Sequence, residues 1–150
     1  MIKQNPLLTI LFIICLAVSG SADSLTVIAV GDIMMGSDYP ASMLPPEGGA
    51  FLYRNVANLL QSADLTVGNL EGVLLSGGTC AKQTARGKVY AFRTPPSFAQ
   101  HLVNAGFDFM NLANNHLNDF GPGGVESTMR TLDGCGIAYG GPEVLYQIRN

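Results

Sequence analysis

A chain of 150 residues has room for one domain at most. Its 11 acidic residues outnumber its 8 lysines and arginines, for a formal net charge of −3. Because nonspecific nucleic-acid binding depends on a cationic surface, this composition argues against nucleic acid as a partner.

Residues 1–22 have the three-part layout of a secretory signal peptide. Lys3 precedes an apolar run over residues 7–18, and small residues follow up to Ala22, with a predicted cleavage site before Asp23. The apolar run is shorter than the roughly 17 residues that a membrane span needs. We therefore expect export to the periplasm or cell surface, with residues 23–150 as the mature domain. An uncleaved N-terminal membrane anchor is the alternative.

Beyond the signal segment, short apolar runs alternate with segments of helical spacing, which predicts an α/β fold. The run at residues 25–30 is continuous, as expected for a strand covered on both faces. The other expected elements are a helix within 51–62, a strand at 65–67, an extended piece at 89–92, a helix from Pro96 to Gly106, a strand at 107–112, a helix around 125–132 ended by Gly134, and a strand at 137–139. Because βαβ crossovers are right-handed, this order predicts a mostly parallel sheet.

Polar side chains follow three of the expected strands. Asp32 follows the first, Glu71 the second and His116 the third. Residues at the carboxyl ends of parallel strands lie beside the crevice at that edge of the sheet, so we expect a polar site there. Carboxylates in that position can bind a hard or borderline divalent cation. Alternatively, Asp32 caps a turn and Glu71 is a loop anion.

The segment after the third strand is the richest in polar groups. Asn115 can supply an amide oxygen to a cation, and His116 can donate a proton near neutral pH. Alternatively, Asn114 and Asn115 hold a tight turn around a structural histidine. Asp119 either orients His116 or caps the helix that follows.

The other histidine and the two mature cysteines carry weaker signals. His101 is not part of a cluster of polar site residues on its predicted helix, and we expect it to have a structural role. Cys80 and Cys135 could form a disulfide in an oxidising compartment or remain free, and the sequence leaves both outcomes open.

Five segments carry a resemblance to a known family. They are TVIAVGDIMMG, ADLTVGNLEG, FRTPP, GFDFMNLANNHLNDFGPGG and a closing L-x-G-x-G-I-x-Y-x-G. Their order and spacing over residues 24–141 resemble the bacterial CapA family of capsule or poly-γ-glutamate biosynthesis proteins. That family is similar to the calcineurin-like metallophosphatases. The resemblance implies a four-layer, α+β-like β-sandwich flanked by helices, with a divalent metal site, single or dinuclear, at the strand ends.

The resemblance also implies residue roles. Asp32, Glu71 and Asn115 match the metal ligands, and His116 matches the general acid. The supporting positions are Asn69, Asn114 and Asp119. Met34 stands where the metallophosphatases have a metal-binding histidine.

The resemblance implies further histidine ligands downstream, but no histidine follows His116 in this sequence. We therefore expect a fold that is incomplete at its C-terminus, in a shortened copy or in the front part of a longer protein.

Three functions remain open. The first is an exported protein that hydrolyses or transfers at a phosphoester or acyl centre during assembly or release of an anionic capsule polymer. The second is a non-catalytic scaffold for a membrane-bound synthesis complex. The third is an inactive fragment that does not fold stably, because half a sheet leaves an open hydrophobic edge.

Overall fold

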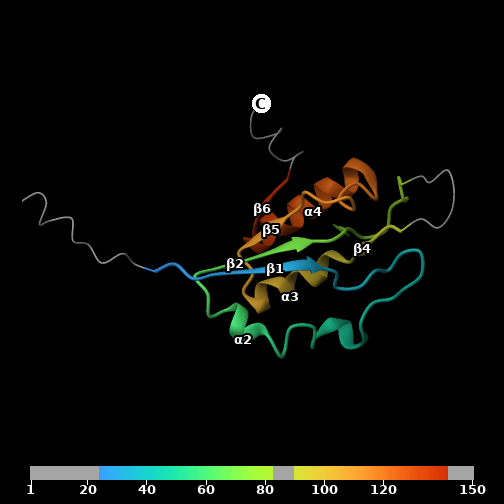
Figure 1. The fold of residues 1–150 in the computed structure, drawn as a ribbon. Coiled ribbons are helices and arrows are strands. Elements are labelled where there is room, and N and C mark those ends of the chain that lie inside the picture. The colour runs from blue at the N-terminus through green and yellow to red at the C-terminus, as the bar shows by residue number, and fades with distance from the viewer. Residues whose placement is uncertain (1–23, 83–89, 142–150) are drawn as a thin grey trace, which may run out of the picture.

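The centre of the fold is a four-stranded parallel sheet with the strand order β1-β2-β5-β6 (Figure 1). Its strands are β1 (Val27–Ile33), β2 (Leu65–Leu70), β5 (Phe109–Asn111) and β6 (Ala138–Gly140). The computed structural model describes residues 24–82 and 90–141. The predicted α/β class and parallel pairing are therefore confirmed, and the predicted signal segment lies outside the described residues.

A second, smaller sheet pairs β3 (Val73–Leu74) in parallel with β4 (Arg93–Thr94). Of the extended piece predicted at 89–92, residue 89 lies outside the described residues and 90–92 are not part of a strand. The strand begins only at Arg93, where pairing with β3 starts. Within residues 24–82 and 90–141, the second sheet has only these two strands. The sandwich of two sheets implied by the resemblance therefore remains a prediction.

The helices lie in the connections between strands. They are η1 (Pro46–Gly49), α2 (Ala57–Leu60), η2 (Pro96–Phe98), α3 (Ala99–Ala105) and α4 (Gly121–Cys135). Helix α2 contacts α3, and α3 contacts α4. These contacts place α2, α3 and α4 side by side, as expected for right-handed crossovers that all advance in one direction along the sheet. No helix in the described part of the chain has the length and hydrophobicity of a transmembrane span.

Helix α3 packs its predicted apolar face into the main core. Phe98, Leu102 and Ala105 are buried there, together with Met110 of β5. The helix ends at Gly106, whose φ of 86° is left-handed and favours a residue without a Cβ. The prediction of this helix and its end is confirmed.

Strand β1 is not covered on both faces, contrary to the expectation from its continuous apolar run. Among the strands of the described residues it lies at the edge of the sheet, and Val27 and Val30 are 49% and 39% exposed. A single neighbouring strand and helices on one face leave part of β1 open. The continuous apolar run therefore belongs to a strand whose apolar side chains are partly exposed.

The helix predicted within residues 51–62 is also wrong in length. Only α2, a single turn, is helical, and Val56 just before it has a non-helical φ of −123°. Leu60 is buried, whereas Leu59 is 64% exposed. The helical spacing of apolar residues here does not correspond to one buried face, so packing does not extend the helix.

Helix α4 passes through the predicted stop at Gly134 and ends at Gly136. Gly136 has a left-handed φ of 70°, and its backbone N–H donates to the carbonyl oxygens of Leu132 and Asp133. Both glycines fit a helix end by sequence, and the backbone conformation distinguishes them.

Alanine substitutions at these two glycines should have opposite effects. We expect Gly134→Ala to raise the free energy of unfolding by about 0.5–1 kcal/mol, because alanine favours a helix interior and a Cβ there meets no atom within 4 Å. We expect Gly136→Ala to lower it by about 1 kcal/mol, because its φ is left-handed. Urea unfolding followed by circular dichroism measures both. The reverse order of stabilities would contradict this helix end.

Candidate functional site

Three neighbouring parallel strands bring polar side chains to one edge of the main sheet. Asp32 of β1 lies opposite Asn69 of β2, which in turn lies opposite Asn111 of β5. A bulge in β1 between Ala29 and Asp32 adds one residue relative to β2. Because a bulge re-aims the side chains that follow it, this irregularity decides where the Asp32 carboxylate points.

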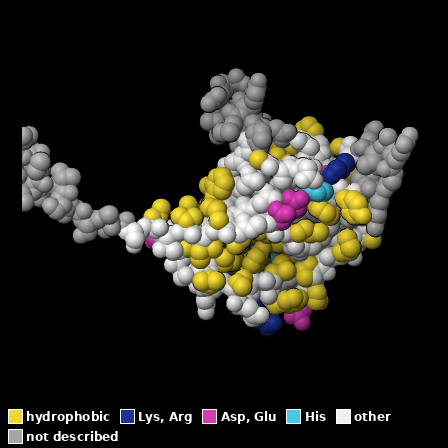
Figure 2. Space-filling model, viewed as in Figure 1, with side chains coloured by type: hydrophobic (Ala, Val, Ile, Leu, Met, Phe, Trp, Pro, Cys, Tyr) yellow, Lys and Arg dark blue, Asp and Glu magenta, His cyan; other side chains and the backbone are white. Residues whose placement is uncertain are grey.

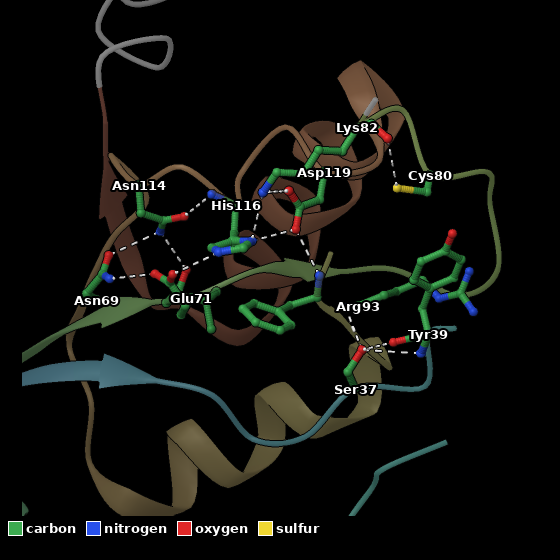
Figure 3. Close-up of polar contacts among 12 residues, drawn as sticks. Ser37, Tyr39, Asn69, Glu71, Cys80, Lys82, Arg93, Asn114, His116 and Asp119 are labelled. Carbon is green, nitrogen blue, oxygen red and sulfur yellow. Dashed lines mark hydrogen bonds and ion pairs between the residues drawn. The ribbon is translucent and has the colours of Figure 1, made fainter. Parts of the chain in front are cut away.

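Asn69 links the two candidate carboxylate ligands. Its Nδ2 donates to Asp32 Oδ1 at 2.7 Å. The same Nδ2 donates to Glu71 Oε2 at 3.0 Å (Figure 3). Its Oδ1 accepts from Asn111 Nδ2 at 2.8 Å and from Asn114 Nδ2 at 3.1 Å. Asn69 therefore holds a carboxylate from β1 and one from the loop after β2 in fixed relative positions.

Asn114 anchors the loop that carries the histidine. Its Nδ2 donates to the Leu70 carbonyl at 2.8 Å, and its Oδ1 accepts from the His116 backbone N–H at 3.0 Å. The tight turn considered for Asn114 is present, and it serves to place His116 beside the end of β2.

His116 lies between two carboxylates. Its Nδ1 is 2.7 Å from Asp119 Oδ2, and its Nε2 is 3.4 Å from Glu71 Oε1. The ring of Phe92 covers one side of the imidazole, with ring centroids 4.3 Å apart. Asp119 makes no capping bond to α4, whose N-cap is Phe120. Of the two roles considered for Asp119, the structure therefore has the geometry of the histidine partner.

A polar cavity of about 470 Å³ lies at the ends of the strands. Its polar lining comes from the side chains of Asp32, Asn69, Glu71, Asn114 and Asn115. His116 is buried behind Glu71 rather than lining the cavity. The structure thus brings all predicted site residues together, with the histidine and Asp119 in a second layer.

The donor atoms around this cavity are oxygens suited to a hard cation. Asp32, Glu71 and Asn115 all line this cavity, and Mg²⁺ is commonly held by one or two carboxylates with waters or substrate phosphates. Within the described residues no three His, Cys, Asp or Glu side chains are placed to hold a metal ion. Two carboxylates are fewer than a metal site built from protein ligands alone needs, so a cation here would depend on waters or substrate oxygens for its other ligands.

An apolar groove of about 440 Å³ adjoins the polar cavity, and Asp32 borders both. Figure 2 shows hydrophobic side chains gathered on this face beside the acidic ones. Burial raises the pKa of Tyr53, which lines the groove, to about 12, so its hydroxyl stays neutral at physiological pH. The candidate site therefore has a polar side and an apolar side that meet at Asp32.

The remaining predicted features lie outside this site. Cys80 and Cys135 are both free, and they pack against different hydrophobic clusters, so the disulfide considered is absent from the structure. His101 lies with its Nε2 2.7 Å from the Gly48 carbonyl oxygen, which matches the structural role expected for it.

Sequence reasoning missed three residues that shape the site: Lys82, Phe92 and Asn111. Lys82 and Phe92 flank a loop without usable periodicity, and they reach His116 only through tertiary packing. Asn111 lies within the strand predicted at 107–112. An amide side chain near the end of an apolar run was a signal that could have marked it as a site residue.

Comparison with known proteins identifies the family. The family model described as "Bacterial capsule synthesis protein PGA_cap" matches residues 26–144. The chain is 29% identical over 119 residues to the capsule biosynthesis protein CapA of Bacillus anthracis and 29% identical over 125 residues to the PGA biosynthesis protein CapA of Bacillus subtilis (strain 168). An uncharacterized protein of Sinorhizobium fredii, y4sH, is 32% identical over 123 residues.

Each of these matches covers 79% of this chain but only 28%, 32% and 25% of the respective relative. The chain therefore spans between a quarter and a third of the length of these relatives. Because the family model covers most of the chain, and does so over the segments that form the strand-end site, this protein belongs to the PGA_cap family of bacterial capsule synthesis proteins.

Proposed function

We propose that this protein takes part in capsule or poly-γ-glutamate biosynthesis as an exported, metal-dependent hydrolase or transferase. Family membership and the printed names of the two CapA relatives support the biological process. One observation carries the chemistry: the carboxylates of Asp32 and Glu71 line one cavity at the strand ends, and a His–Asp pair lies directly behind Glu71. The substrate class is an anionic polymer or another phosphoester or acyl compound. Its site of action is the periplasm or the cell surface, within reach of a membrane-bound synthesis complex.

In this proposal, the oxygens of Asp32, Glu71 and Asn115 hold a hard divalent cation, and Asn69 orients the two carboxylates. A bound cation would polarise a phosphoryl or carbonyl oxygen of the substrate. Among the described residues, the lining of the polar cavity includes carboxylates and amides but no Lys or Arg. In this proposal, the bound cation supplies the positive charge that attracts a negatively charged substrate.

His116 supplies the proton in this proposal. Asp119 engages Nδ1, so Nε2 is the ring nitrogen that faces Glu71 and the cavity beyond it. In the doubly protonated ring, Nε2 carries the proton that a leaving oxygen would accept. Since Glu71 lies between Nε2 and the cavity, its side chain both holds the cation and controls access to that proton.

Neutralising Glu71 tests the metal-holding role. We expect Glu71→Gln to weaken Mn²⁺ binding by at least roughly 10–100-fold, the loss typical even of residues that only orient metal ligands. Glutamine keeps the size of the side chain and an acceptor for Asn69, so the loss reports the missing charge. Isothermal titration calorimetry with Mn²⁺ on the purified chain measures the affinity.

The matched control is Glu126→Gln, which changes an exposed ion pair with Arg130 on α4 and should leave Mn²⁺ affinity unchanged. Equal affinities of the wild type and Glu71→Gln would remove Glu71 from the cation site. A wild-type chain that binds no Mn²⁺ would instead favour the non-catalytic scaffold.

A further inference from the structure

Lys82 lies close to His116, in the loop after β3, and has no part in the function proposed above. Its Nζ lies 3.0 Å from Asp119 Oδ1 and 3.4 Å from His116 Nδ1 (Figure 3). In the same loop, the Ala81 backbone N–H donates to the Asp119 carbonyl oxygen at 2.8 Å. The loop after β3 therefore holds Asp119 through both its backbone and a charged side chain.

The two oxygens of Asp119 have different surroundings. Oδ2 faces His116 Nδ1 at 2.7 Å and accepts the Phe92 backbone N–H at 2.8 Å. Oδ1 is buried and makes no hydrogen bond, and the Lys82 ammonium, although 3.0 Å away, meets it as an ion pair without hydrogen-bond geometry. The Asp119 side chain is 1% exposed and that of Lys82 is 29% exposed. Because a buried carboxylate is costly without a counter-charge, Lys82 is the group that compensates Oδ1.

We propose that Lys82 is a positioning residue for His116 that acts through Asp119. By facing Oδ1, the ammonium keeps the carboxylate in the rotamer that presents Oδ2 to Nδ1. The imidazole is then held by Asp119 at Nδ1 and by Phe92 on one side, and Nε2 stays directed at Glu71. The catalytic consequence rests on the proposed function, whereas the positioning itself is a property of the fold.

Histidine NMR separates positioning from catalysis. The chain contains only His101 and His116, so the ¹⁵N signals of a histidine-labelled sample are assigned by comparison with a His116→Gln variant. In the wild type we expect a proton on His116 Nδ1 that exchanges slowly with water. In Lys82→Met we expect that proton to exchange about tenfold faster or more, as for a weakened hydrogen bond to a charged group. Lys82→Arg should restore slow exchange, because arginine keeps the positive charge.

Arg130→Met is the matched control, since Arg130 pairs with Glu126 at an exposed site and should leave the His116 signal unchanged. Urea unfolding of every variant shows whether the chain still folds. The inference is overturned if Lys82→Met leaves Nδ1 exchange unchanged, if Lys82→Arg does not restore it, or if wild-type His116 carries no Nδ1 proton. If the NMR result holds but the wild type shows neither Mn²⁺ binding nor turnover, the positioning role stands and the proposed function fails.

Discussion

Replacing His116 with alanine should lower Mn²⁺-dependent turnover by about 10²–10⁴-fold, the contribution typical of a general acid. Mn²⁺ affinity should stay unchanged, because the imidazole lies behind Glu71 and outside the cavity lining. Turnover of p-nitrophenyl phosphate and of p-nitrophenyl acetate, together with Mn²⁺ calorimetry, measures the two properties separately.

His101→Ala is the control for this prediction, because His101 contacts Gly48 and lies outside the strand-end site. Unchanged turnover in His116→Ala would remove the histidine from the mechanism. A parallel loss of Mn²⁺ affinity would make His116 a ligand or a support of the cation site rather than the proton donor.

Replacing Asp119 with alanine should cause the largest loss of stability at the site, about 3 kcal/mol, as expected when one partner of a buried charged network is removed. The substitution leaves the Lys82 ammonium without its counter-charge, and the Phe92 N–H and His116 Nδ1 without their acceptor. We choose the low end of the usual range because Lys82 is partly exposed and can turn to water. Urea unfolding at neutral pH measures the free energy of unfolding.

Glu126→Ala is the control for stability. It removes an exposed carboxylate from α4 and should change the free energy of unfolding by less than about 0.5 kcal/mol. A loss below about 1 kcal/mol in Asp119→Ala would mean that the carboxylate is dispensable. The wild-type curve also tests the expectation of an unstable fragment, because a cooperative transition would contradict it.

The local hydrophobic pattern and the parallel direction of the strands were enough to predict the main sheet and the proximity of the site residues. Asp32 lies near the carboxyl end of β1, and Glu71 and His116 come after β2 and β5, so parallel pairing alone places them at one edge of the sheet. The apolar face of α3 and its glycine end at Gly106 are likewise local features. These predictions needed no knowledge of distant contacts.

The features that sequence reasoning missed depend on tertiary contacts. The exposure of β1 follows from its position at the edge of the sheet, which its apolar residues do not encode. Lys82 lies 34 positions before His116, in a loop whose composition resembles an ordinary solvated loop. The choice between two roles for Asp119 likewise required the positions of Phe92 and Lys82, because both roles place an acidic residue just before a helix.

The central claim is that the carboxylates of Asp32, near the end of β1, and of Glu71, just after β2, hold one hard cation at the strand-end cavity. Anomalous diffraction from a crystal soaked in Mn²⁺ tests it most directly. We predict one anomalous peak in contact with the carboxylates of Asp32 and Glu71, and a clearly weaker peak there in Glu71→Gln at the same Mn²⁺ concentration. A peak elsewhere, or none in a crystal that has taken up Mn²⁺ on its surface, would contradict the claim.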